Sequence, residues 1–242
     1  MQKTLENCKK CNSKISGNYC SNCGQPVTLK RINQKYILNE IGSVLNFDKG
    51  IFYTIKELLI RPGETVKKFI VEDRNRLVKP VIFIIISSLI YTVLTQIFQF
   101  EDGYVNFKSS TETATTSIFT WVQNNYGYAN ILMGIFIAFW IKLLFRKYDY
   151  NFYEILILLC FLMGIGMLLY AVFGIIESLT QFKILHIGGF IGFLYISWAI
   201  GQFFGKKNKV NYIKAFLAYL LGMITFSLAA VALGFLIDLI KQ

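Results

Sequence analysis

The chain has 242 residues, of which 55% are hydrophobic and only 16% are charged, and its formal net charge is +11. Soluble globular proteins carry about 25% charged residues, so this composition excludes a soluble enzyme, a disordered protein and a secreted disulfide scaffold. Residues 1–79 contain 15 Lys and Arg against 7 Asp and Glu, whereas residues 80–242 contain 10 against 7. The sequence therefore predicts a basic, polar front end joined to an apolar body.

Four of the five cysteines form two C-x2-C pairs near the N-terminus, Cys8/Cys11 and Cys20/Cys23. This spacing suits one tetrahedral Zn²⁺, because each pair places two sulfurs about 2.3 Å from the metal. Gly24 permits the positive φ that such a turn often needs. Two disulfides in an exported domain, or an iron site, are the alternatives, but no signal peptide is recognised before the cysteines, which favours reduced thiols. We therefore expect a structural zinc ribbon over residues 1–30, folded by its metal and without an open position for a catalytic water.

Residues 31–79 are predicted to connect the ribbon to the membrane through amphipathic helices. Apolar residues recur at helical spacing, and Pro62-Gly63 ends the first helix and allows a second. An apolar stripe beside Lys and Arg clusters is typical of a helix lying in the membrane interface and bound to anionic headgroups. The alternative is a soluble helix pair packed on the zinc ribbon. The stripe comprises Phe52, Ile55, Leu59, Val66, Phe69 and Ile70, and the basic residues are Arg61, Lys67, Lys68, Arg74, Arg76 and Lys79.

Residues 80–242 are predicted to form a transmembrane helical bundle. A bilayer core of about 30 Å needs roughly 20 helical residues, and five apolar runs reach about that length. A sixth membrane element arises if Ile118–Asn130 enters the bilayer as part of a re-entrant hairpin. The fold class is thus an all-α polytopic membrane protein with about five spans and a small cytosolic zinc ribbon. The predicted spans are Val81–Phe100, Tyr126–Phe145, Ile155–Ile176, Ile187–Gly205 and Ala215–Ile237.

The loop charges predict the orientation. With the N-terminus in the cytoplasm and five spans, 22 basic residues lie inside and 3 lie outside, namely Lys108, Lys183 and Lys241. This split follows the positive-inside rule and agrees with reduced cysteines in the cytoplasm. We expect a bacterial inner-membrane protein whose C-terminus is periplasmic.

Ionisable groups in or beside the spans are candidate functional residues, because their burial is expensive. Lys142, Glu154, Glu177 and Asp238 all lie at span edges, where anchoring is the favoured role. His186 lies in a predicted outer loop, and Cys160 lies in an apolar run as a small buried side chain. We recognise no catalytic motif and predict a protein without enzymatic activity.

Glycines in the fourth predicted span indicate how it packs. Two glycine pairs each leave one face of the helix without side-chain bulk, so that a neighbouring helix can approach closely. They are Gly188-x3-Gly192 and Gly201-x3-Gly205, and their faces point in nearly opposite directions on a helix. The sequence therefore predicts that this helix lies between two neighbours. Candidate partner surfaces are Gly134-x3-Ala138 and Ala230-x3-Gly234.

The order of these parts resembles an uncharacterised family of bacterial inner-membrane proteins with an N-terminal zinc ribbon, a Leu-rich stretch ending in Arg-Pro-Gly and a helical bundle. It is also loosely similar to bacterial Yip1-like proteins, which have five spans after a cytosolic segment. The resemblance implies a fold type and an inner-membrane location, and it carries no activity or substrate. It rests on Cys8/Cys11/Cys20/Cys23-Gly24-Gln25, Asn46–Gly50, Thr54, Leu58-Leu59-x-Arg61-Pro62-Gly63, Arg74-Asn75-Arg76 and Pro80.

Two functions remain open. The first is a non-catalytic membrane scaffold whose zinc ribbon recruits a protein partner, with anionic lipid bound at the connector and a homo-oligomer allowed. The second is a transporter or channel for a lipid or neutral solute, regulated by the ribbon. Nucleic acid is a disfavoured partner, because the ribbon's lysines suit lipid equally well and Tyr19 is its sole stacking aromatic.

Overall fold

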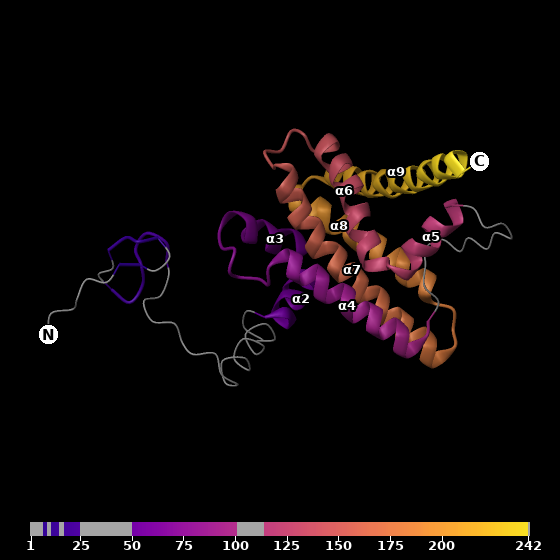
Figure 1. Ribbon diagram of the computed structural model, residues 1–242, viewed down its shortest axis with the longest axis horizontal. Coiled ribbons are helices and arrows are strands. Elements are labelled where there is room, and N and C mark those ends of the chain that lie inside the picture. Colours follow the sequence, from indigo (N-terminus) through magenta and orange to yellow (C-terminus); the bar gives the residue numbers. More distant parts are fainter. Residues whose placement is uncertain (1–6, 9–10, 15–16, 25–49, 101–113, 242) are drawn as a thin grey trace. The chain divides into compact units, whose positions relative to one another are not determined.

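The computed structural model describes residues 7–8, 11–14, 17–24, 50–100 and 114–241 (Figure 1). The chain divides into two compact units, Met1–Ser43 and Val44–Gln242. The predicted connector begins at residue 31, but its first part, 31–49, lies outside the described residues, as do residues 25–30 of the predicted ribbon. From residue 50 onward the connector belongs to the same unit as the apolar helices.

The second unit is all-helical over its described residues, as the sequence predicts. Five of its helices are long and apolar enough to cross a membrane, which matches the predicted number of spans. Short α5 precedes α6 as a separate helix, with Asn125 between them. The helices are α2 (Ile51–Ile60), α3 (Pro62–Val71), α4 (Pro80–Phe98), α5 (Ala114–Asn124), α6 (Tyr126–Leu144), α7 (Phe152–Thr180), α8 (Leu185–Gly205) and α9 (Lys209–Lys241).

Local chemistry explains where these helices begin and end. Pro62 and Pro80 stand at the first turn of α3 and α4, where a missing N–H is tolerated. Asn151 and Glu154 form a reciprocal capping box at the start of α7. Gln99 and Gln181 end α4 and α7 in the left-handed conformation, with φ of 48° and 61°, a place more often taken by glycine.

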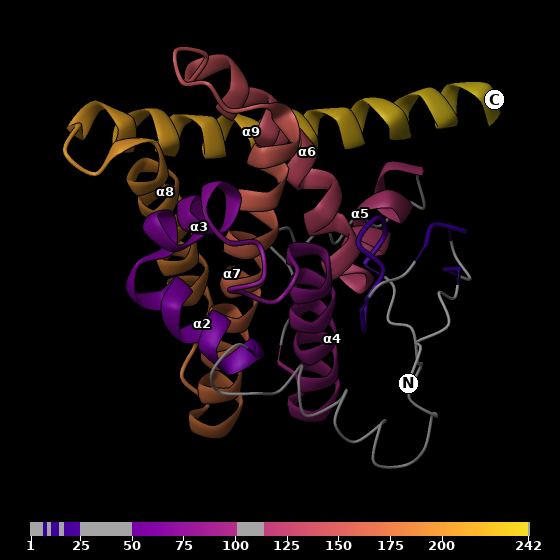
Figure 2. The same ribbon diagram turned by 90° about the vertical axis from the view of Figure 1, so that its left-hand side faces the viewer.

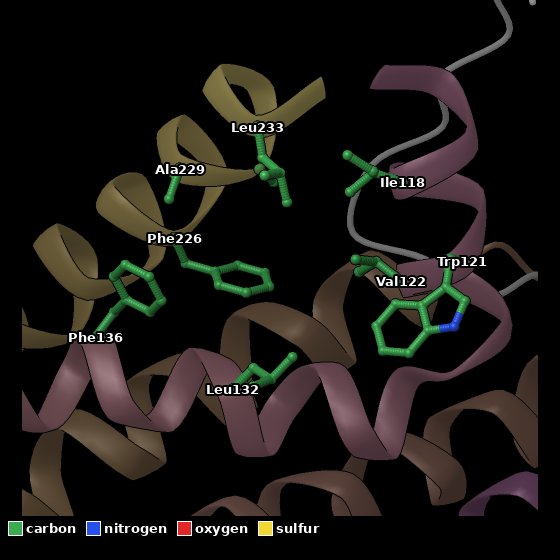
Figure 3. Close-up of a pocket in the computed structure, with 9 residues that line it drawn as sticks. Ile118, Trp121, Val122, Leu132, Phe136, Phe226, Ala229 and Leu233 are labelled. Carbon is green, nitrogen blue, oxygen red and sulfur yellow. The ribbon is translucent and has the colours of Figure 1, made fainter. Parts of the chain in front are cut away.

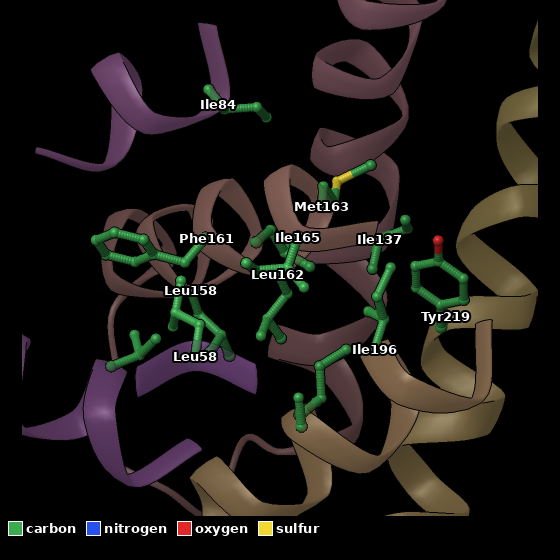
Figure 4. Close-up of a cluster of buried hydrophobic side chains, with 14 of the residues drawn as sticks. Leu58, Ile84, Ile137, Leu158, Phe161, Leu162, Met163, Ile165, Ile196 and Tyr219 are labelled. Atoms are coloured by element: carbon green, nitrogen blue, oxygen red, sulfur yellow. The ribbon is translucent and has the colours of Figure 1, made fainter. Parts of the chain in front are cut away.

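Helix α7 is the centre of the unit and packs against α2, α3, α4, α6 and α8. Leu158, Phe161 and Leu162 are fully buried in its first half, where they meet side chains of the surrounding helices (Figure 4). Helix α4 runs parallel to α7, since Phe83 contacts Phe161 near their starts and the Ser178 hydroxyl donates to the Phe98 carbonyl near their ends. A parallel pair is what the first and third of five successive spans should form.

Helix α8 lies between α7 and α9, as its two glycine stripes predict. A Cβ at Gly188 would meet Phe173 of α7, whereas a Cβ at Gly201 would meet Tyr212 of α9. The predicted partner surfaces are wrong, however. Gly134 faces Met163 of α7 and Gly234 faces Thr115 of α5, so small residues on α6 and α9 serve other contacts.

Helix α9 runs across its neighbours rather than alongside them (Figure 2). It contacts α8 through Phe216, then α6 through Phe226, and then α5 near Gly234. Much of its surface is exposed and apolar, including Leu228 and Phe235. An exposed apolar surface of this kind is typical of a contact with a membrane or with another protein. The course of α9 departs from a bundle of side-by-side spans.

Helices α2 and α3 pack on α7 and α8, which corrects part of the predicted interfacial stripe. Val66, Phe69 and Ile70 of α3 are buried in the protein core and are therefore unavailable to lipid. On α2, Phe52 and Leu59 of the stripe are exposed, whereas Ile55 is partly buried against the core. Hydropathy alone could not separate the two cases, because a helix that faces protein and one that faces lipid share the same periodicity.

Candidate functional site

The four N-terminal cysteines form two turns of the same geometry. In the first turn the N–H of Asn12 donates to the Cys8 carbonyl, and in the second the N–H of Gly24 donates to the Cys20 carbonyl, both at 2.8 Å. Asn12 and Gly24 have φ of 59° and 71°. The positive φ predicted at Gly24 is thus confirmed, and Asn12 takes the same role because asparagine tolerates this conformation.

The two turns bring all four sulfurs together. The ligand atoms of Cys8, Cys11, Cys20 and Cys23 lie within 4.8 Å of one another, and the pairs Cys8–Cys23 and Cys11–Cys20 are each 3.5 Å apart. Sulfurs at the corners of a tetrahedron around Zn²⁺ are separated by about 3.8 Å, given bonds of about 2.3 Å. The predicted residues therefore form a cluster that could hold one metal ion.

Ser13 is a part of this site that sequence reasoning missed. Its Oγ lies 2.9 Å from Cys11 Sγ and 3.2 Å from Cys20 Sγ. The hydrogen bond with Ser13 is the main cause that lowers the pKa of Cys11 to about 6, and it also lowers the pKa of Cys20. A hydroxyl between two ligands favours their thiolate forms, which are the forms that bind metal.

The rest of the described N-terminal unit is small. Asn7 and Lys14 form an isolated antiparallel bridge, and the chain bends at Gly17 and Asn18, where a turn is predicted. Tyr19 is 67% exposed. Among the described residues of this unit the buried ones are Cys8 and Cys20, so the candidate metal ligands themselves form its centre.

The carboxylates at the span edges cap helices. Glu154 belongs to the capping box of α7. Glu177 accepts the N–H groups of Ile184 and Leu185, at 2.8 and 2.6 Å, at the start of α8. Asp238 accepts the N–H of Ala114, the first residue of α5, at 2.8 Å. An acidic group at a helix N-terminus is stabilising, so these three residues have a structural role.

Two other flagged residues also lie at the ends of helices. Nζ of Lys142 donates to the Tyr150 carbonyl at 2.6 Å, in the loop between α6 and α7. His186 is exposed in the first turn of α8. The sequence predicts Lys142 at a span edge, where the structure has it. It predicts His186 in an outer loop, whereas His186 is the second residue of α8.

A second polar site joins α2 and α3 to α8 inside the apolar unit. The buried N–H of Gly63 donates to Oε1 of Gln202 at 2.7 Å, and the Tyr195 hydroxyl donates to the Leu58 carbonyl at 2.9 Å. A Cβ at Gly63 would meet the backbone of α8, so glycine is needed for this approach. We call Gly63, Leu58, Tyr195 and Gln202 the α3–α8 junction. Sequence reasoning missed it, because Gln202 and Tyr195 are single polar groups in an apolar run.

The loop between α3 and α4 is held by polar contacts to α2. The buried Thr54 hydroxyl donates to the Gly50 carbonyl and accepts the N–H of Val78. Arg76 lies 3.3 Å from Glu57. Hydrogen bonding with the Tyr53 side chain is the main cause that raises the pKa of Arg76 above its usual value, and the contacts with Glu57 add a smaller part. At least one of the predicted lipid-binding arginines is thus engaged with protein.

Residues 48–92 match a family described as "Protein of unknown function (DUF3667)". The matched segment covers α2, α3 and the first part of α4, including Gly63 of the α3–α8 junction. No curated protein and no solved structure matches the chain.

Proposed function

We propose that the protein is a non-catalytic integral membrane scaffold whose N-terminal unit, folded around zinc, recruits a protein partner. The observation that carries this proposal is the closed cluster of four cysteines in a unit separate from the apolar helices. Four thiolates complete the coordination of Zn²⁺ and leave no position for a substrate. Such a site builds a small surface, on which the exposed Tyr19 offers an aromatic contact.

The membrane in this proposal is a bacterial inner membrane with the zinc unit in the cytoplasm. The loop charges support this orientation. Helix α3 adds to it, because Glu64 lies 3.5 Å from Lys206 beyond the end of α8. The basic residues of α3 and of the α8–α9 loop thus share one end of the unit, where anionic lipid can bind both.

A crosslinking pull-down from membranes tests the scaffold. Wild type is compared with a variant in which Cys8, Cys11, Cys20 and Cys23 are all Ser, and with Cys160→Ser as the matched control. We expect one defined partner with wild type and with Cys160→Ser, and loss of that partner in the four-cysteine variant although it still inserts. Retention of the partner by the four-cysteine variant would contradict recruitment by the zinc unit.

A transporter or channel for a lipid or neutral solute is the second candidate. A small gap of about 10 Å³ inside the apolar unit is lined by Asn130 together with Gly166, Gly188 and Gly192. A Cβ at Gly192 would meet nothing within 4 Å, and Asn130 is a buried polar residue. Uptake of a neutral solute by proteoliposomes that is abolished by Asn130→Leu would favour this function over the scaffold.

A further inference from the structure

A cavity of about 330 Å³ lies between α5, α6 and α9 (Figure 3). Trp121 and Val122 of α5 face Phe226 and Leu233 of α9 across it, and Leu132 of α6 lies beneath. Its lining is made of hydrocarbon and aromatic side chains. The lining residues are Ile118, Trp121, Val122, Leu132, Phe136, Phe226, Ala229, Ala230 and Leu233.

Small side chains on α9 create this space. Ala229 and Ala230 lie one turn beyond Phe226 and present only methyl groups to the cavity, where a larger residue would fill it. The volume is about twice that of an apolar cavity of ~150 Å³ that stays dry and binds benzene. Water is excluded for the same reason, because it would lack the polar partners that it needs here.

The mouth of the cavity lies on the apolar outer surface. Trp121, Leu132 and Leu233 are 46%, 45% and 54% exposed, and the last two lie on helices long enough to cross a membrane. The solvent at such a surface is the hydrocarbon of the bilayer. An empty slot would forfeit the dispersion contacts of its walls, and a flexible chain entering from the side restores them.

We propose that this cavity binds one acyl chain of a membrane phospholipid. Apart from the Trp121 indole N–H, the described lining residues carry no polar side-chain group, so selection is by chain and not by charge. A slot between three helices accommodates a single flexible acyl chain. A helix from a second copy of the protein would instead need a broad groove between rows of side chains. The site is independent of the zinc unit, and its occupancy does not depend on the proposed scaffold function.

Photocrosslinking in vesicles tests the proposal. The full-length protein is reconstituted in phosphatidylethanolamine and phosphatidylglycerol with a trace of phospholipid that carries a diazirine in one acyl chain, and adducts are mapped by mass spectrometry. We expect adducts to concentrate on Trp121, Leu132 and Phe226 rather than on Val93, an exposed apolar residue of α4. Ala229→Phe should reduce them about tenfold, a change equal to about 1.4 kcal/mol.

Leu228→Phe is the matched control, because Leu228 is exposed on the same helix and lies outside the cavity lining. It should leave the adducts unchanged. If Ala229→Phe does not fold, Leu132→Trp is used as the test variant instead, because it fills the cavity from α6. Adducts are then read at Trp121 and Phe226. Equal labelling of Val93 and the cavity, or no loss in a folded filled variant, would overturn the proposal. Crosslinks from these residues to a second copy would overturn it too, by assigning the cavity to an interface.

Discussion

Ser13 contacts two of the four candidate metal ligands at once. Its hydroxyl lies within hydrogen-bonding distance of Cys11 Sγ and Cys20 Sγ, one from each cysteine pair. Groups that hydrogen-bond to metal ligands orient them and tune their basicity. The residue thus links the two turns, and it belongs to the site although it is not itself one of the four cysteines.

Replacing Ser13 should weaken the metal site while leaving its ligands in place. We expect Ser13→Ala to lower zinc affinity about tenfold, the lower end of the effect of losing an outer-shell partner. Competition with a chromogenic chelator measures this on the purified protein. Ser21→Ala is the matched control, because Ser21 is exposed in the second turn, and its affinity should equal that of wild type. Equal affinities for all three proteins would show that the Ser13 contacts are incidental.

The four cysteines of the candidate metal site could be predicted to lie together because they are close in sequence. Two C-x2-C pairs within sixteen residues leave few ways to arrange the four sulfurs except around one point. Glycine after the second pair predicts the positive φ that the structure has at Gly24. Asn12 and Ser13 could not be predicted in the same way. Asparagine adopts a positive φ only in some contexts, and the direction of a serine hydroxyl depends on what the fold places beside it.

At the scale of elements, α3 is anchored to α8 at its first turn. The Gly63 N–H is one of the N-terminal groups of α3 without a partner inside the helix, and Gln202 supplies that partner from α8. Because Gly63 has no side chain, the two backbones approach closely. Gly63, the second residue of α3, therefore docks this helix on α8.

A side chain at Gly63 should disrupt this anchor. Gly63→Ala is expected to destabilise the protein by about 1–3 kcal/mol, because its Cβ would meet backbone atoms that cannot move aside. Gly192→Ala is the matched control, since its Cβ would meet nothing within 4 Å, and alanine is a better helix former than glycine. Denaturation in detergent followed by circular dichroism measures both. An equal loss of stability in both variants would mean that the close approach at Gly63 does not stabilise the protein more than an ordinary helical glycine does.

The polar half of the junction gives a separate prediction. Gln202→Leu leaves the buried Gly63 N–H without its acceptor, which should cost about 1–3 kcal/mol. Gln181→Leu is the control, because Gln181 is exposed at the end of α7 and should change stability much less. The same denaturation experiment compares the two. A stability for Gln202→Leu equal to that of the control would indicate that another acceptor or water takes the place of Oε1.

The helices of the junction could be predicted from the sequence, but their contacts could not. Pro62 and the spacing of apolar residues mark α2 and α3 clearly. The bond between Gly63 and Gln202 joins residues 139 positions apart, and nothing in the local pattern of either residue points to the other. For the same reason the sequence predicts a lipid-facing stripe on α3, whereas α3 packs against α7 and α8.

At the scale of the whole molecule, hydropathy gives the number of long helices and not their course. Long uninterrupted apolar runs predict five such helices, and the structure has them. Packing order depends on where small residues permit close approach, as Gly188 and Gly201 do on the two sides of α8. The crossing course of α9 has no sequence signal, because its apolar residues surround the helix without a preferred face.

That course makes α9 the decisive element for topology. With five crossings the C-terminus lies opposite the N-terminus, whereas a helix that lies across its neighbours without crossing leaves both on one side. A periplasm-specific reporter fused after Ser110 and after Gln242 should be active, and one fused after Lys207 should be inactive, because the basic residues around Lys207 retain that loop in the cytoplasm. A cytoplasm-specific reporter at the same three positions should give the opposite pattern, which controls for expression. An inactive periplasmic reporter after Gln242, combined with an active one after Ser110, would mean that α9 does not cross. The chain would then have four spans, and α9 would lie along the inner surface of the membrane. Its exposed apolar face, which includes Leu228 and Phe235, would contact that surface.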